Sequence, residues 1–303
     1  MCAIAGILYK NGKRLNYSTG EALNRMLEAT LHRGPDSAGW ALYHDPKDER
    51  LRLCFYIPRS KVAKDVIADI QKIISDLGAE IVEDNFIGCI YMVKLKCSIP
   101  VRKLYQSFKS VAELFSIGTR LDIIKDVGQP EDLAPLYSIN DFDGTHGLAH
   151  LRLATESGVH ANTTHPFWAP GFADICTVHN GMITNYWIMR RRLERRGMEF
   201  LSNNDTELIA VYLAYKMSQD VLLEDALKSS LDDFDGTYSY LVSTPDSIGF
   251  AKDKLAAKPV VVYEDDNVIA ISSEEVGLNS LFPGQTLETT EQPPLTYGIW
   301  YRA

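Results

Sequence analysis

An apolar strand that begins at the third residue places the tightest limit on what this chain can fold into. Residues 3–9 read AIAGILY, and this run predicts a buried strand directly after Met1 and Cys2. Chain ends normally fray, so a strand this close to the N-terminus has to be held in the interior by neighbouring strands. The strand would therefore fix the side chain of Cys2 at its own beginning.

Cys2 is a candidate nucleophile for this reason. Removal of Met1 would leave Cys2 with a free α-amine, whose unperturbed pKa is about 7.7–8.0. A terminal cysteine of this kind carries the attacking thiol and a proton shuttle in one residue. The alternative is a cysteine that happens to follow Met1 and has no catalytic role. The strand at 3–9 favours the catalytic interpretation because it would hold the terminus rigidly.

Composition excludes several classes of protein. The 303 residues carry 31 Lys and Arg against 40 Asp and Glu, a net charge of −9, which argues against nucleic-acid and anionic-membrane binding. No apolar run approaches the length of a membrane span, and the N-terminus does not resemble a signal peptide. Five cysteines without a CxxC pair favour free thiols in a reducing cytoplasm. The histidine spacings fit no metal-ligand set, so we expect no metal site.

Residues 51–127 are predicted to form a separate unit. We expect strands at 51–57, 80–84, 87–95 and 117–127, with helices at 60–77 and 101–115. This βαββαβ order is typical of a ferredoxin-like lobe, a small sheet with two helices on one face.

Strand patterns return from about residue 146. Strands are expected at 148–153, 175–179, 238–243, 248–251, 259–263 and 268–272, and helices at 185–196, 205–218 and 222–231. Strands in hairpin-like succession with a few helices indicate antiparallel sheets in an α+β fold.

Five separate motifs agree with one another in order and spacing. They are Cys2, HRGPDSAG at 32–39, HLRLAT at 150–155, HNG at 179–181 and SNNDTE at 202–207. Together they resemble the class II glutamine amidotransferases, which are N-terminal-nucleophile hydrolases. The resemblance implies a four-layer αββα sandwich of antiparallel sheets spanning 2–303, interrupted by the lobe at 51–127.

The resemblance also implies catalytic roles. Cys2 would attack the side-chain amide of glutamine, and Asn180 with the Gly181 backbone N–H would form the oxyanion hole. Read alone, Asn180-Gly181 is also a strong hairpin-turn signal.

Four further residues would bind the substrate by the same resemblance. Arg152 would pair with the α-carboxylate of glutamine, assisted by the hydroxyl of Thr155, and Asp205 would take the α-ammonium. Arg33 and the loop after it would cover the bound glutamine. Taken singly, Arg152 could be a surface charge on an edge strand, and Asp205 an acid favoured at a helix start.

Within this family the chain is most similar to the amidotransferase subunit of glutamate synthase and N-methylglutamate synthase. The signs are His165-Pro166-Phe167, the stretch 125–128 and the insertion at 51–127. This similarity implies a hetero-oligomer that delivers ammonia to a separate synthase subunit. FMN and any iron–sulfur cluster would belong to the partners, and this chain would carry no cofactor.

Two other functions stay open on the sequence alone. One is an N-terminal-nucleophile amidase that acts on a different amide. The other is a non-catalytic regulatory subunit. We expect the lobe at 51–127 to dock the synthase, and the arginine-rich helix at 190–196 is the second candidate surface. The ammonia acceptor and the oligomeric state are not encoded in any motif that we recognise.

Overall fold

The core of the fold consists of two antiparallel sheets. The computed structural model describes residues 2–10, 12, 14–46, 49–153, 158 and 160–302. Within these residues, the larger sheet has seven strands in the order β15-β13-β14-β1-β8-β2-β7. Its strands are β1 (Ala3–Tyr9), β2 (Ser37–Tyr43), β7 (Leu121–Val127), β8 (His146–Arg152), β13 (Val261–Glu264), β14 (Val268–Ser272) and β15 (Thr290–Glu291).

The N-terminal strand occupies the interior of this sheet. β1 pairs with β14 on one side and with β8 on the other, and every one of its residues is buried. The prediction of a buried strand at 3–9 is confirmed.

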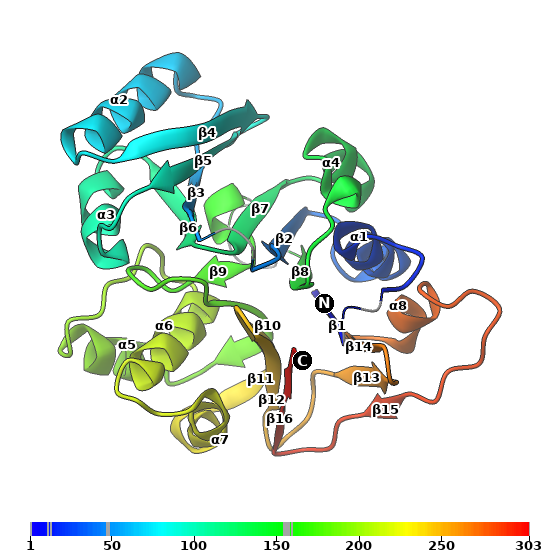
Figure 1. Cartoon of the computed structure of the whole chain (residues 1–303). Helices are drawn as coiled ribbons and strands as arrows, with labels where there is room; N and C mark the ends of the chain where they lie inside the picture. The colour runs from blue at the N-terminus through cyan, green and yellow to red at the C-terminus, as the bar shows by residue number, and fades with distance from the viewer. Residues whose placement is uncertain are drawn as a thin grey trace.

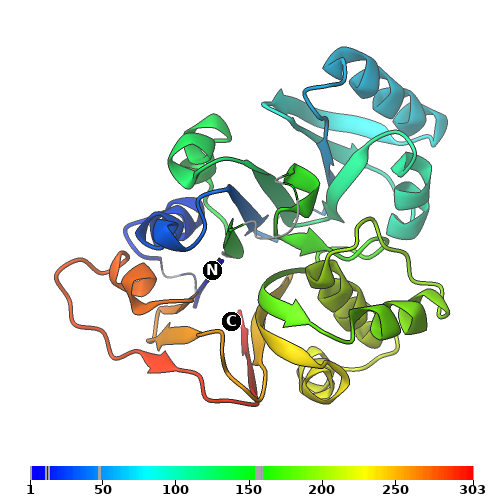
Figure 2. The same cartoon turned by 180° about the vertical axis from the view of Figure 1, so that it is seen from behind.

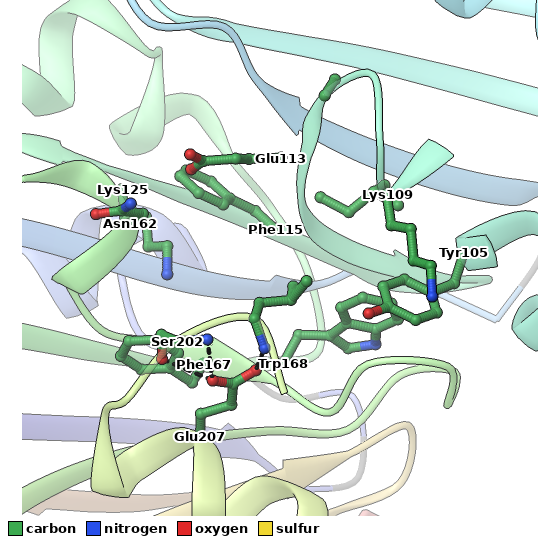
Figure 3. Close-up of a pocket in the computed structure, with 13 residues that line it drawn as sticks. Tyr105, Lys109, Glu113, Phe115, Lys125, Asn162, Phe167, Trp168, Ser202 and Glu207 are labelled. Carbon is green, nitrogen blue, oxygen red and sulfur yellow. Dashed lines mark hydrogen bonds between the residues drawn. The ribbon is translucent and has the colours of Figure 1, made fainter. Parts of the chain in front are cut away.

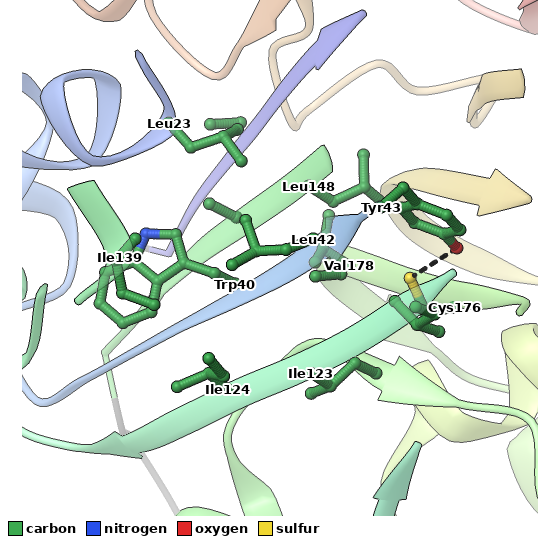
Figure 4. Packing of buried hydrophobic residues seen from close by; sticks show 14 of the residues in the cluster. Leu23, Trp40, Leu42, Tyr43, Ile123, Ile124, Ile139, Leu148, Cys176 and Val178 are labelled. Atoms are coloured by element: carbon green, nitrogen blue, oxygen red, sulfur yellow. Dashed lines mark hydrogen bonds between the residues drawn. The ribbon is translucent and has the colours of Figure 1, made fainter. Parts of the chain in front are cut away.

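The second sheet packs face to face against the first. Over the same described residues it has five strands in the order β16-β12-β11-β10-β9. They are β9 (Phe167–Trp168), β10 (Cys176–Ile183), β11 (Gly236–Thr244), β12 (Ser247–Lys252) and β16 (Thr296–Tyr301). Strands β10 and β11 contact β1 and β8. The Tyr43 hydroxyl crosses between the sheets, donates to Ser243 O at 2.8 Å and lies 3.5 Å from Cys176 Sγ (Figure 4). The expectation of antiparallel sheets in a mixed fold is confirmed.

Helices cover the outer faces of both sheets (Figures 1 and 2). On the larger sheet α1 contacts β1, β8 and α8, whereas α6 and α7 contact β10 and β12 of the smaller sheet. Helix α1 is capped by Ser18, whose hydroxyl accepts the Glu21 N–H, and it buries Leu23, Met26 and Leu27 at helical spacing. The helices of this part are α1 (Thr19–Ala29), α4 (Pro130–Leu136), α5 (Tyr186–Glu194), α6 (Asp205–Met217), α7 (Leu223–Asp233) and α8 (Glu275–Asn279).

Residues 51–118, all of them described, form a lobe with its own four-stranded antiparallel sheet in the order β4-β5-β3-β6. Two helices pack on it, with Ile70 and Ile74 of α2 and Leu104 and Phe108 of α3 buried. The elements are β3 (Leu51–Tyr56), α2 (Ala63–Asp76), β4 (Glu80–Ile87), β5 (Ile90–Lys96), α3 (Val101–Phe108) and β6 (Glu113–Gly118).

The single strand predicted over 117–127 is wrong. The chain reverses at 119–120, and β7 leaves the lobe to pair with β2 of the larger sheet. The carboxylate of Asp174 holds this turn because it accepts the backbone N–H groups of residues 119–121, each at 2.9 Å. Gly118 is required here, since a Cβ on it would lie 1.9 Å from Asp174 Oδ1. The four-stranded sheet therefore ends at Gly118, and residues 121–127 belong to the larger sheet.

Two further elements differ from the sequence prediction. The helix predicted at 101–115 ends at Phe108, because Glu113–Gly118 joins the lobe sheet as a strand. Strand β16 (TYGIWY) was not predicted; it lies at the edge of the smaller sheet, where its residues are half-buried or exposed. In the described part of the chain, no helix is both long and apolar enough to cross a membrane.

Candidate active site

Cys2 lies at the edge of the larger sheet where β1 begins and the neighbouring strand β8 ends. It precedes β1, and the register of β1 against β8 places Ala3 opposite Leu151. The Leu153 N–H donates to Cys2 Sγ at 3.4 Å. The sulfur is therefore held at the end of β8, directly beyond Arg152.

The backbone of Cys2 is held by two side chains that come from distant parts of the chain. Arg33 Nε donates to the Cys2 carbonyl oxygen at 2.9 Å, and Asn180 Nδ2 donates to the same oxygen at 3.0 Å. Ser273 directly follows β14, and its hydroxyl accepts the Ile4 N–H at 2.9 Å and the second N–H of Asn180 at 3.1 Å. This network fixes the position of the candidate nucleophile.

Arg33 is buried and contacts Cys2, the candidate nucleophile. Only 5% of its side chain is exposed, and its Nη1 pairs with Glu274, which also lies 3.0 Å from His32 Nε2. Burial alone would raise the pKa of Glu274, but the ion pair with Arg33 outweighs it and the pKa lies below its usual range. In this structure Arg33 holds the backbone of Cys2 in place, and its covering of bound glutamine stays a prediction.

Asn180 and Gly181 lie inside strand β10, paired with Ser239 and Tyr238 of β11. The hairpin-turn interpretation of this dipeptide is wrong. Gly181 has a φ of +121°, and a Cβ on it would lie 1.9 Å from the Thr237 carbonyl oxygen. No other residue type would fit this backbone without moving β11.

Arg152 ends strand β8 and is only 7% exposed. Its Nη1 donates to Thr163 Oγ1 at 3.0 Å. The backbone N–H of Asp36 donates to the Arg152 carbonyl at 3.1 Å, and Gly34 packs against the same backbone. These contacts bring the loop after Arg33 to the Arg152 segment. Thr155, predicted to assist Arg152, lies outside the described residues.

Asp205 is the first residue of α6, and its carboxylate points back to strand β10. Oδ2 accepts the Ile183 N–H at 3.0 Å, and Oδ1 lies 3.5 Å from His179 Nδ1. Burial acts to raise the pKa of Asp205, but the His179 ring and the Ile183 N–H outweigh it, and the pKa is lowered. Asp205 is therefore an anion at neutral pH, as an ammonium-binding group has to be.

Three buried histidines lie behind this site and were missed as a group by the sequence analysis. The His150 and His165 rings stack with centroids 4.0 Å apart, and Thr206 Oγ1 lies 3.2 Å from His179 Nδ1 and 3.1 Å from His165 Nε2. Burial lowers the pKa of His150 to about 3 and that of His165 well below its usual value. Among the described residues no group of His, Cys, Asp and Glu side chains is arranged to hold a metal ion.

Glu274 and Ser273 were also missed. The only sequence signal is a pair of serines followed by glutamate at the end of the strand at 268–272. Ser273 contacts Asn180, 93 residues away, and Ile4, 269 residues away, while Glu274 pairs with Arg33, 241 residues away, so no local pattern identifies them.

The fold and this site define an amidotransferase of the N-terminal-nucleophile type, and comparison with known proteins supports that class. The family model described as "Glutamine amidotransferase domain" matches residues 150–280. The chain is 37% identical to a putative glutamine amidotransferase of Methanothermobacter thermautotrophicus, over 95% of this chain and 96% of the relative. It is 32% identical to the glutamine amidotransferase-like protein GlxB of Rhizobium meliloti, over 99% of this chain and 98% of the relative.

Solved structures agree on the fold. The glutamine phosphoribosylpyrophosphate amidotransferase of B. subtilis superposes with a TM-score of 0.61 at 17% identity, over 97% of this chain and 46% of that chain. The present chain thus spans about half of that enzyme.

The chain belongs to the glutamine amidotransferase family and is homologous to class II members of it. It is an enzyme of the glutamine-hydrolysing type.

Proposed function

We propose that this chain is the glutaminase subunit of a synthase of the glutamate synthase or N-methylglutamate synthase type. The observation that supports the glutaminase activity is the fixed position of Cys2, whose carbonyl accepts hydrogen bonds from Arg33 and Asn180 while its sulfur lies beside the Arg152 segment. With Met1 removed, the same residue would present a thiol and a free amine.

The reaction begins with attack of Cys2 Sγ on the amide carbon of glutamine. The negative charge that develops on the amide oxygen would be stabilised by Asn180 Nδ2 and the Gly181 backbone N–H. Both Asn180 N–H groups are engaged here, by Cys2 O and Ser273 Oγ, so one of them has to turn to the oxyanion. Ammonia leaves with the thiol proton, and water then hydrolyses the thioester to glutamate and restores the thiol.

Charge selects the free amino acid as substrate. Arg152 offers a planar guanidinium to the α-carboxylate, and Asp205 is held as an anion for the α-ammonium. An amidase for a different amide would not need this pair of opposite charges. That rival is therefore less well supported than glutamine hydrolysis.

The proposed architecture follows from the contacts between layers. Contacts of α1 with the larger sheet, between the sheets, and of α6 and α7 with the smaller sheet support a four-layer αββα sandwich. The element order β3-α2-β4-β5-α3-β6 and the strand order β4-β5-β3-β6 support a ferredoxin-like lobe.

Delivery of ammonia to a separate synthase is the other part of the proposal. It rests on the resemblance of the HPF segment and the insertion to synthase-associated amidotransferases. FMN and any iron–sulfur cluster are assigned to the partner subunits, and the assembly is placed in the cytoplasm.

A cysteine-selective experiment tests the glutaminase proposal. A diazoketone analogue of glutamine should label the wild type at Cys2, and Cys2→Ala should lose both the label and the release of glutamate from L-glutamine. Cys97→Ala is the matched control, because Cys97 is also a half-buried free thiol. It should keep both properties. Labelling at Cys97, glutamate release by Cys2→Ala, or a mature protein that retains Met1 would contradict the proposal.

The synthase type is tested by reconstitution. The wild type mixed with a purified FMN-containing synthase and an electron donor for its flavin should support glutamine-dependent reductive amination of oxoglutarate to glutamate. Cys2→Ala should support the reaction only when ammonia is added in place of glutamine.

A further inference from the structure

A cavity of about 220 Å³ lies where the lobe meets the amidotransferase core (Figure 3). Its walls come from α3 and β6 of the lobe and from β7, β9 and α6 of the core. None of the residues that line it belongs to the Cys2 site described above. The cavity is therefore a second concave site, and it does not depend on the proposed glutaminase activity.

One end of the cavity is aromatic. Tyr105 and Trp168 meet edge to face there with ring centroids 5.9 Å apart, and Phe167, Phe115 and Leu201 continue the wall. The volume is about one and a half times that of a cavity of ~150 Å³ that binds benzene. There is room for one aromatic ring with a short polar tail.

The other end is polar, and Lys125 lies at its base. Figure 3 shows Lys125, Asn162 and Glu113 gathered on the side away from Tyr105. Only 3% of Lys125 is exposed, and its Nζ donates to Thr164 O at 2.8 Å and to Pro166 O at 2.9 Å. An ammonium has three N–H donors, so one is left without an acceptor in the described part of the chain.

The environment of Lys125 favours an anion at this point. Its Nζ lies over the rings of Phe115 and Phe167, at 4.5 and 4.3 Å from their centroids. Burial lowers the pKa of Lys125 to about 7, so a bound carboxylate would stabilise the charged form that burial disfavours.

The remaining charged groups define the second half of the ligand. The carboxylate of Glu207 is already engaged by three donors, because it accepts the Leu201 N–H at 2.6 Å and the N–H and hydroxyl of Ser202 at 2.7 and 2.6 Å. Lys109, at the aromatic end, pairs with Glu199 at 2.8 Å. Glu113 is left at the exposed rim beside Lys125. A simple anion would face Glu113 and a simple cation would face Lys125, whereas a zwitterion satisfies both.

We propose that this cavity binds a free α-amino acid with an aromatic side chain. The carboxylate of the ligand accepts the spare N–H of Lys125, its ammonium pairs with Glu113, and its ring lies among Tyr105, Phe167 and Trp168.

Binding of L-phenylalanine, measured by calorimetry on the whole chain, tests the proposal. Phenethylamine lacks the carboxylate and should bind at least tenfold more weakly, because it leaves the buried Lys125 unpaired. Hydrocinnamate lacks the ammonium and should bind about fivefold more weakly, since Glu113 is at the rim. The variant Arg152→Ala should keep L-phenylalanine binding. Absence of binding by the wild type at millimolar concentration, or its loss in Arg152→Ala, would overturn the proposal.

A substitution at the exposed rim of the cavity tests the proposal without disturbing the buried contacts that hold the fold. Lys125→Met would strip the donor from two buried carbonyl groups, so Glu113→Gln is the better substitution. It should weaken L-phenylalanine binding about fivefold and leave hydrocinnamate binding equal or tighter. Lys109→Gln, on the opposite side of the cavity, is the matched control and should change neither affinity. Unchanged affinity for L-phenylalanine in Glu113→Gln would refute the assignment of the ammonium.

Discussion

Replacing Asp205 by asparagine should remove the preference of the enzyme for the α-ammonium of glutamine while leaving the fold in place. Asparagine has the same size, and its carbonyl oxygen can still accept the Ile183 N–H that Asp205 accepts at 3.0 Å. What is lost is the negative charge opposite the substrate ammonium.

The magnitude follows from the burial of the carboxylate. Breaking a buried charge pair costs about 2–5 kcal/mol. The Asp205 side chain is 23% exposed, so the lower end applies. About 2 kcal/mol corresponds to a loss of roughly 30-fold in kcat/KM for L-glutamine. Because the pKa of Asp205 is lowered, the carboxylate stays charged and this ratio should be constant between about pH 6 and pH 8.

The assay compares two substrates on two enzymes. Glutaramate is glutamine without its ammonium group, so it cannot use the charge of Asp205. The wild type should prefer glutamine, and Asp205→Asn should hydrolyse both substrates with similar kcat/KM. Glutamate and glutarate are measured by mass spectrometry. An equal loss on both substrates would show that Asp205 only supports the structure near His179, and no loss on either would refute its contact with the ammonium.

Three other substitutions and one deletion test the remaining assignments. Asn180→Ala should lower kcat by about 10²–10³ with a smaller effect on KM, because the oxyanion exists only near the transition state; an unchanged kcat would remove Asn180 from the oxyanion hole. Arg152→Ala should cost about 2–5 kcal/mol of transition-state stabilisation, a loss of roughly 30-fold to several thousand-fold in kcat/KM for glutamine, and normal turnover would favour an amidase of another specificity. Asp122 is 7% exposed and pairs with Arg52 at 2.6 Å, so Asp122→Asn should lower the free energy of unfolding by about 3 kcal/mol at pH 7, measured with urea. Burial acts to raise the pKa of Asp122, but His44 and Arg52 have the larger and opposite effect, so the pKa lies below its usual range. The stabilisation is therefore present above about pH 4, and the free energies of unfolding of the variant and the wild type should converge as the pH falls below that. Replacing residues 51–118 with a Gly/Ser linker should preserve basal glutamine hydrolysis and abolish capture of the synthase; intact capture would move the docking surface to the helix that carries Arg190.

The candidate nucleophile Cys2 and the strand that holds it could be predicted from the sequence. The strand at 3–9 is a run of apolar residues, and its burial between β14 and β8 is what such a run requires. Arg152, Asn180 and Asp205 were identified because each lies in a short local motif. The structure brings Asn180 and the Arg152 segment to Cys2, and it turns the carboxylate of Asp205 toward β10.

The strand at 117–127 shows where local pattern fails. Leu121–Val127 has the same apolar character whether it completes the lobe or joins the larger sheet. Its partner is decided by Asp174, which lies about 55 residues further along and binds the backbone of the turn. A hydrogen bond of that kind leaves no periodicity in the sequence.

Sequence alone predicted the class of chemistry, because Cys2 and each of the short motifs can be recognised within a single segment of the chain. Tertiary structure decided how that chemistry is held in place. Arg33 and Glu274, which form one ion pair, are 241 residues apart, and Asn180 is 178 residues from the carbonyl group that it holds. The cavity that joins Lys125 to Glu113 and the aromatic wall exists only because the lobe packs on the core. Contacts between distant segments depend on how whole sheets pack, and no single segment of the chain encodes that packing.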